Sequence, residues 1–408
     1  MPFFRYSQPG HRSLTAPYSL VQAAYWMNYC VALGFAAVYL QALGYTNTQL
    51  GTVVASGHLL SAVLGPSLAA RIDKSPRISA KRLLPLLLGL QACVLIVLML
   101  FPQKGALTSL FYALYICFST SVNTLNLKLY SDITWHGLRT DYGFTRGIGS
   151  LAYVLTSVVL GLLAKQDPVH VPPVAGLVFS AFQLTAFLLI APKIPEGGAK
   201  EEKPAGRSLL SFVRANRLFC LQLAGTVLIY FAHNTIYSYL INITRNVGGD
   251  TATMGFFSGY MAAIEIPVML LFTRLFGKKD SGRLLCFAFI FFVLKSAAIA
   301  AAHHVWSLSL AFLLQAPSFA LYTAAIVPYV QKIIAQEDAA KAQSLTYTVT
   351  VLGSVLASLL SGRLYDRFSV FTTLRIACAV CLAGAGIAFF AVRKRSLLSA
   401  VETESRLS

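Results

Sequence analysis

The chain has 408 residues, of which 56% are hydrophobic and only 12% are charged. This composition excludes an ordinary water-soluble protein, because soluble domains carry about 25% charged residues. The formal net charge of +18 is the kind of excess that nucleic-acid-binding proteins show, but it sits among long apolar runs and therefore needs another explanation.

Twelve long apolar runs follow one another along the chain. They lie at 18–41, 48–70, 81–101, 105–131, 145–164, 173–192, 217–244, 252–276, 282–301, 304–331, 344–364 and 370–392. Each has about the 20 residues that a helix needs to cross a hydrocarbon core of about 30 Å. A backbone inside lipid must satisfy its own hydrogen bonds, so each run predicts a membrane-spanning helix. The first run lacks a small-residue cleavage site and is predicted to be a retained span, not a signal peptide.

The positive residues fall mainly in alternate gaps between these runs. If odd-numbered runs lead outward, 26 of the 33 Lys and Arg residues lie on one side of the membrane. Six lie on the other side, and Lys295 lies inside a run. Such a bias marks the cytoplasmic side and places both termini there. The net charge is thus a topology signal of a multi-pass protein in a lipid bilayer, and we predict no nucleic-acid partner.

A polar stretch divides the chain into two halves of six runs each. We predict an N-terminal half at 1–192, a cytoplasmic linker at 193–216, a C-terminal half at 217–392 and a cytoplasmic tail at 393–408. The linker is rich in Gly, Pro and mixed charge, which favours flexibility. A shift of 204 residues aligns short Gly and Ser patterns of the two halves. Parallel six-helix repeats with a solute site between them near the midplane are a recurrent transporter architecture.

Small residues repeat at every fourth position in the eleventh run. Gly353, Ala357 and Ser361 share one face of the predicted helix. Small side chains on one face allow close approach of a neighbouring helix. We therefore expect this face to be a tight helix contact.

Two charged residues lie within the predicted spans. Glu265 is flanked by apolar residues near the middle of the eighth run, and Lys295 lies within the ninth run, about 9 Å from its outer end. A charge in the membrane costs several kcal/mol unless it faces a cavity or a partner. Glu265 is a candidate proton carrier or substrate-binding acid, with a structural salt bridge as the alternative. Lys295 either pairs with Glu265, binds an anion, or extends its ammonium to the interface.

Further polar and aromatic residues in the spans are candidates to line a solute cavity. They are Asn28, Tyr29, Asn123, Asn126, His233, Asn234 and Tyr237. A buried polar group needs a partner, which makes Asn28 and His233 the strongest of these. Aromatic residues at the ends of spans are also typical of interface belts, and that is the alternative for the rest.

Three segments resemble one branch of the major facilitator superfamily, which holds lactose permease, nucleoside–proton symporters and phenylpropionic acid transporters. DYGFTRGIGS at 141–150 is similar to the branch's D-Y-G-R-x-R-x-W-G-S, with Phe144 and Ile148 as departures. EIP at 265–267 is similar to its A-E-I-P segment, and GRLYDRF at 362–368 to its G-x-L-Y-D-R-F. The loop between the second and third spans keeps Arg71, Asp73 and Lys74 of the branch's gating motif in a degenerate form.

The resemblance implies an all-α fold of twelve transmembrane helices in two six-helix pseudo-repeats. It implies that Arg146 binds substrate, with an interfacial anchor as the alternative. Lys128 stands where relatives place an acid that pairs with this arginine, which points to an anionic substrate. Gln315 stands where the branch often has a proton-linked His, and Lys295 lies in the helix whose arginine serves proton coupling in the sugar permease. Arg71, Asp73 and Lys74 would form a gating loop.

The resemblance also implies the kind of transport and its setting. The expected function is secondary active transport of a sugar, nucleoside or organic anion by alternating access, coupled to protons as a symporter. An organic-anion antiporter or exporter of the same fold is the alternative. Such proteins act as monomers in the plasma membrane, here a bacterial inner membrane.

Other classes of protein lack the residues they require. No G-x-x-x-x-G-K-[ST] is present for ATP, and the predicted spans hold no paired acids, H-E-x-x-H or Ser/His/Asp set for a membrane enzyme. Cys378 and Cys381 lie in a span without polar neighbours, which predicts packing and not a metal or redox centre. We therefore predict no enzyme, no cofactor and no metal. A receptor or scaffold would have no use for Glu265 and Lys295 in the membrane.

Overall fold

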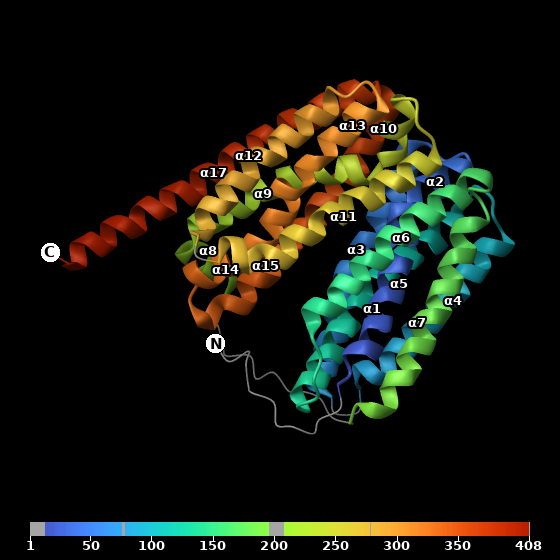
Figure 1. Ribbon diagram of the computed structural model, residues 1–408, viewed down its shortest axis with the longest axis horizontal. Helices are drawn as coiled ribbons and strands as arrows, with labels where there is room; N and C mark the ends of the chain where they lie inside the picture. Colours follow the sequence, from blue (N-terminus) through green and yellow to red (C-terminus); the bar gives the residue numbers. More distant parts are fainter. Residues whose placement is uncertain (1–12, 76–77, 196–207, 278, 408) are drawn as a thin grey trace. The chain divides into compact units, whose positions relative to one another are not determined.

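The computed structural model describes residues 13–75, 78–195, 208–277 and 279–407 (Figure 1). Its regular structure is helical, apart from an isolated bridge between Ser13 and Arg139. Eleven of the described helices are long and apolar enough to cross a membrane. A bent pair, Thr15–Gly34 and Ala36–Ala42, turns by 45° and makes a twelfth span if counted as one. The prediction of an all-α membrane protein is confirmed.

The described residues form two compact units. Unit 1 holds the residues up to Tyr45 and 56–195, and unit 2 holds 46–55 and 208–407. The start of helix α3 thus groups with unit 2. The predicted linker overlaps residues 196–207, which lie outside the described part, and contains one short helix, α8. The predicted domain boundaries remain predictions.

The elements before the linker begin with the bent first span. They are α1 (Thr15–Tyr29), η1 (Cys30–Gly34), α2 (Ala36–Ala42), α3 (Asn47–Lys74), α4 (Ala80–Leu100), α5 (Ala106–Trp135), α6 (Tyr142–Gln166), α7 (Val171–Ile190) and η2 (Ala191–Lys193). Aromatic and aliphatic side chains from α1, α4, α5 and α7 form the core of unit 1, with Tyr18, Leu84, Leu125 and Phe187 almost fully buried.

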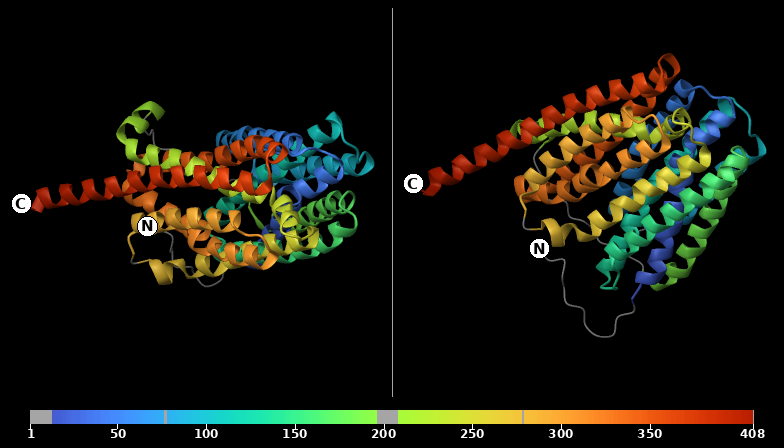
Figure 2. Two further views of the ribbon diagram at one scale, coloured as in Figure 1. Left: turned by 90° about the horizontal axis from the view of Figure 1, so that it is seen from above. Right: turned by 45° about the horizontal axis from the view of Figure 1, so that its top comes forward.

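The elements from residue 208 onward end with the longest helix of the described chain. They are α8 (Leu209–Ala215), α9 (Arg217–Ser238), α10 (Leu240–Asn246), α11 (Thr251–Phe276), α12 (Ser281–Ala300), α13 (Val305–Phe312), η3 (Leu313–Gln315), η4 (Ala316–Ala320), α14 (Leu321–Ile333), η5 (Gln336–Asp338), α15 (Ala339–Leu356), η6 (Ala357–Ser361), α16 (Gly362–Arg367) and α17 (Val370–Leu407). Figure 2 shows α17 extending beyond the other helices of unit 2.

Helix ends are fixed by local sequence. Asp141 accepts a hydrogen bond from the Phe144 N–H at the start of α6, which satisfies one of the free donors of the first turn. Gly44 and Gly248 have φ angles of 84° and 87°, which other residues rarely adopt. The two glycines are separated by the 204-residue shift that relates the halves in sequence. This is a local correspondence, and the repeat as a whole remains a prediction.

The helix contacts of unit 2 rely on small residues. Gly353 of α15 meets Tyr230 so closely that an added Cβ would lie 2.5 Å from the tyrosine Cβ. Ser361 Oγ lies 2.6 Å from Thr235 Oγ1, so both ends of the predicted small-residue face contact α9. The expected tight contact along this face is confirmed.

A second close contact joins α9 to α17. A Cβ at Gly225 would lie 2.5 Å from the Gly384 carbonyl oxygen, and one at Gly384 would lie 2.6 Å from the Gly225 carbonyl oxygen. Backbone atoms on both sides leave no flexible side chain to move aside. The two helices can therefore approach this closely only with glycine at both positions.

Replacement of Gly384 by alanine should destabilise unit 2. Overpacking costs about 1–3 kcal/mol, and a unit of this size loses about 2–4 °C in Tm per kcal/mol. Gly386→Ala is the matched control, because a Cβ there meets nothing within 4 Å. Thermal unfolding of the detergent-solubilised protein measures both. Equal Tm values for the two variants would contradict the proposed helix contact.

Candidate functional site

Lys295 of α12 lies inside unit 2 and is only 2% exposed. Its Nζ lies 3.0 Å from His233 Nδ1 and 2.9 Å from Gln315 Oε1. An ammonium group has only donors, so Nδ1 accepts and the ring proton of His233 sits on Nε2. The side chain therefore points to buried partners and does not extend its ammonium to the membrane interface.

Gln315 connects this lysine to Glu265. The Gln315 Nε2 donates to Glu265 Oε1 at 2.7 Å and to the Tyr237 hydroxyl at 3.2 Å. The Tyr237 hydroxyl in turn lies 3.5 Å from Glu265 Oε1. The amide of Gln315 thus turns its oxygen to the cation and its nitrogen to the carboxylate. Glu265 and Lys295 are linked through this one side chain, which is fully buried.

Aromatic rings enclose the polar cluster and are not singled out by the sequence. Phe319 stacks on the His233 ring at a centroid distance of 4.7 Å and an interplanar angle of 7°. The ring centroid of Phe292 lies 4.8 Å from Lys295 Nζ, within the range of a cation–π contact. Its spacing of three residues from Lys295 is the only sequence signal for this contact, since such spacing places two residues on one helix face.

The helix that carries Gln315 is interrupted at that residue. The 3₁₀ segment η3 ends at Gln315, and the π-helical turn η4, which contains Pro317, follows at once. A proline in a helix removes a backbone donor, and π-turns are frequent at functional sites. Gln315 therefore lies at a break, whereas Lys295 and His233 lie within continuous helices.

A cavity of about 230 Å³ lies next to the cluster in unit 2. Its lining residues are Tyr230, Tyr322, Thr323, Ile326, Val327, Val330, Gln343, Thr346, Tyr347 and Thr350. Tyr230 separates it from the cluster, because its ring packs edge-on against His233 at a centroid distance of 5.9 Å. The wall is uncharged and combines aromatic rings with hydroxyl and amide groups.

One predicted cavity residue of unit 2 has a partner within its own helix. Asn234 donates to the Tyr230 carbonyl at 2.8 Å, one turn earlier in α9. The structure brings His233, Tyr237, Glu265, Lys295 and Gln315 together as neighbours, whereas Asn234 does not contact the cluster through this bond.

In unit 1, Arg146 lies over an aromatic ring. Its guanidinium is 3.8 Å from the centroid of Trp26, and its Nη1 donates to Ser150 Oγ at 2.5 Å. Gly149 faces the same indole, since any Cβ there would overlap Trp26. The Arg, Gly and Ser of the 141–150 segment thus all serve one contact between α1 and α6.

The predicted asparagines of unit 1 divide into two kinds. Asn28 donates to Ser180 Oγ at 2.8 Å and accepts from the Tyr115 hydroxyl at 2.9 Å, so its amide holds three helices together. Asn126 is fully buried, and its side-chain amide has no hydrogen-bond partner among the described residues. Asn123 is half-buried on the same helix. Tyr29 packs on Trp26 at a centroid distance of 5.1 Å.

Lys128 contacts the predicted gating loop. Its Nζ lies 2.7 Å from Asp73 Oδ1, at the end of α3. Arg71 and Lys74 are exposed beside it. The lysine is therefore paired with an acid of its own unit, and its role in substrate binding remains a prediction.

The chain is similar to a known protein family over most of its length. The model of the MFS_1-like family matches residues 22–376. A protein of Escherichia coli (strain K12), provisionally named a 3-phenylpropionic acid transporter, is 29% identical over 259 residues, which are 62% of this chain and 65% of that protein. A protein of Deinococcus radiodurans, provisionally named a sugar efflux transporter, is 27% identical over 165 residues, 40% of this chain and 42% of that protein. The match thus spans less than two thirds of either relative.

Solved structures of transporters share the fold. The nucleoside transporter NupG has a TM-score of 0.74 at 15% identity, and the match covers 92% of this chain and 97% of that one. A bacterial homolog of the human lysosomal transporter Spinster has a TM-score of 0.68 at 12% identity, with 93% and 96% covered. Because the family model matches most of the chain, this protein belongs to the MFS_1-like family, a transporter family whose members are not enzymes.

Proposed function

We propose that this protein carries a small organic solute across the membrane together with protons, by alternating access. The observation that supports this most is the hydrogen-bonded chain from the half-buried Glu265 through the buried Gln315 to the buried Lys295. When Glu265 is ionised, the chain has one negative and one positive end and no net charge. When Glu265 takes a proton, Lys295 is left with the neutral partners Gln315 and His233.

Protonation of Glu265 therefore changes both the hydrogen bonds and the charge balance of the site. A hydrogen bond to an ionised group is roughly twice as strong as one between neutral groups. Protonation of Glu265 thus weakens its bond from Gln315 and leaves the charge of Lys295 unbalanced. The protein can lower that cost by binding a solute or by changing conformation, and either response couples the proton to transport.

The solute is expected to combine a ring with hydrogen-bonding groups. Tyr230 and Tyr347 offer flat apolar surfaces in the adjacent cavity, and the amide of Gln343 offers donors and an acceptor. The hydroxyls of Thr346 and Thr350 donate to backbone carbonyls of their own helix and offer a solute acceptors only. Nucleosides, sugars and aromatic carboxylates all meet this description. The name of the relative from Escherichia coli makes 3-phenylpropionate the first compound to test.

Replacement of Glu265 by glutamine should abolish solute-driven proton movement. Purified protein in liposomes with an internal pH dye would be given 3-phenylpropionate, a nucleoside and a sugar in turn. We expect at least one solute to acidify the lumen with the unaltered protein, and acidification to fall to the rate of empty liposomes with Glu265→Gln.

Glu337→Gln is the matched control, because it makes the same change in an exposed acid outside the spans. It should leave proton movement unchanged. Exchange of labelled solute that persists in Glu265→Gln would show a folded carrier that has lost coupling. Equal acidification by both variants would exclude Glu265 as the proton carrier.

Replacement of Lys295 by methionine should have the same effect on coupling as Glu265→Gln. Removal of one charge from a buried pair costs about 3–5 kcal/mol, so Tm should fall, and persistent exchange of labelled solute is needed to show that the variant is still a folded carrier. Because the two residues act through one amide, the double variant should behave like either single variant. Solute-driven acidification by Lys295→Met that stays above the rate of empty liposomes would show that the two charges act independently. Lys165→Met, in an exposed lysine, is the control.

A second candidate is an organic-anion exchanger, and the position of Arg146 favours it. A cation held over Trp26 offers a carboxylate both charge and an apolar surface. In that case labelled carboxylates would exchange across the membrane without acidification.

Arg146→Gln distinguishes whether carboxylates bind there. The half-saturating concentration for a carboxylate should rise about tenfold or more, because a hydrogen bond to a charged group contributes about 1.5–3 kcal/mol. The half-saturating concentration for a sugar should stay constant. Arg375→Gln, an exposed arginine on α17, is the control. An equal rise for both solutes would mean that Arg146 has a structural role instead.

A further inference from the structure

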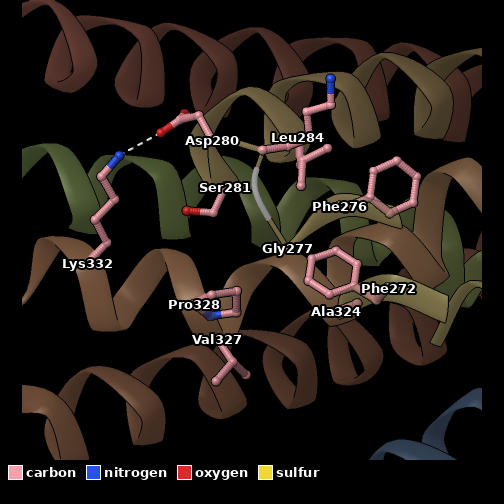
Figure 3. Close-up of a pocket in the computed structure, with 11 residues that line it drawn as sticks. Phe272, Phe276, Gly277, Asp280, Ser281, Leu284, Ala324, Val327, Pro328 and Lys332 are labelled. Atoms are coloured by element: carbon pink, nitrogen blue, oxygen red, sulfur yellow. Dashed lines mark hydrogen bonds and ion pairs between the residues drawn. The ribbon is translucent and has the colours of Figure 1, made fainter. Parts of the chain in front are cut away.

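A second, larger cavity lies in unit 2 where three helices end. It has a volume of about 570 Å³ and is lined by the end of α11, the start of α12 and the last turns of α14. Figure 3 shows the Asp280–Lys332 pair at one side of this cavity and the rings of Phe272 and Phe276 at the other. None of the residues that line it belongs to the polar cluster of His233, Tyr237, Glu265, Lys295 and Gln315.

One wall of the cavity is apolar and continues onto the surface of the helices. Phe272 and Phe276 of α11 line it together with Ala324 and Val327 of α14 (Figure 3). Val327 is 42% exposed. Exposed apolar side chains on membrane-spanning helices lie against lipid, so the wall is open to acyl chains and not only to water.

The rim of the same cavity is basic. Lys279 and Lys332 both line it, and Lys332 is 64% exposed while its Nζ lies 2.6 Å from Asp280 Oδ2. The other oxygen of Asp280 accepts from the Arg283 N–H at 2.9 Å. Burial raises the pKa of Asp280, but these hydrogen bonds outweigh it and hold that pKa below its ordinary value. Both oxygens of the carboxylate thus have partners within the protein. Lys279 and Lys332 together with the ionised Asp280 give the rim a net charge of about +1.

We propose that this cavity binds one acidic phospholipid, with its phosphate at Lys279 and Lys332 and an acyl chain along Phe272, Phe276 and Val327. The apolar wall favours a lipid over a free phosphate ion, which would use only the rim. The spans of α11, α12 and α14 end at the cavity, so it lies at the level of the lipid headgroups. Basic pockets between spans at the cytoplasmic face are a recurrent kind of acidic-lipid site, and this is the face predicted to be cytoplasmic.

Native mass spectrometry of the full-length protein with defined lipids tests this proposal. Phosphatidylglycerol and phosphatidylethanolamine with the same acyl chains would be offered in equal amounts. One phosphatidylglycerol should remain bound in preference, and each of Lys279→Gln and Lys332→Gln should weaken its retention about fivefold. Lys104→Gln, on the other side of the predicted membrane, is the control. Equal retention of both lipids by the unaltered protein would overturn the proposal.

Two further measurements cover the remaining explanations. Ala324→Phe fills the apolar part without removing a charge, so it should reduce retention of the lipid even though both lysines remain. Unchanged retention in this variant would place the lipid elsewhere. Millimolar inorganic phosphate should not displace the lipid, and full displacement would assign the rim to a soluble phosphate ligand instead. Elution of each variant as a single monodisperse species would show that the fold is intact.

Discussion

The absence of water inside the membrane is the constraint on which the rest of this structure depends. A charge there must be solvated by the protein itself, at a cost of several kcal/mol if it is not. Lys295 and Glu265 meet this requirement through Gln315, whose amide turns its oxygen to the ammonium and its nitrogen to the carboxylate. An amide is suited to this position because its polarity is fixed and it does not itself titrate. The two charges are therefore coupled through a neutral group, because a change in the charge of Glu265 alters the hydrogen bond from Gln315, which also bonds Lys295.

Glu265 and Lys295 can be predicted from the sequence because a charged residue stands out in an apolar run. Gln315 is predicted from its place in a resemblance, as a residue that cannot carry a proton, and its role as a bridge cannot be foreseen. The bridge depends on α9, α11, α12 and η3 meeting in space, and sequence spacing does not report contacts between distant helices. The contacts of Phe319 and Tyr230 cannot be predicted from the sequence for another reason. Aromatic residues are common in membrane spans, so nothing in their local sequence separates a ring that packs on His233 from any other.

Polarity within a span is thus a weaker guide than charge. Asn28 is among the strongest candidates by sequence, yet its amide is used by Ser180 and Tyr115 in packing. Lys128 suggests an anionic substrate, yet it pairs with Asp73 at the end of a helix. The Asp280–Lys332 pair has the same form in unit 2, and Lys332 lies 204 residues after Lys128. Asn28 and Lys128 thus serve helix contacts within their own unit, which the sequence cannot distinguish from lining a cavity.

The helices that carry the cluster differ in how freely they can adjust. His233 lies on α9, which is held against α17 by the reciprocal contact of Gly225 and Gly384. Lys295 lies on the continuous helix α12, whereas Gln315 lies at the junction of η3 and η4, where the regular helical hydrogen bonds are interrupted. A change in the charge of Glu265 alters the strength of the bond that Gln315 donates. The residue whose hydrogen bond depends on the charge of Glu265 is therefore the one at a break in its helix, whereas Lys295 and His233 lie on continuous helices.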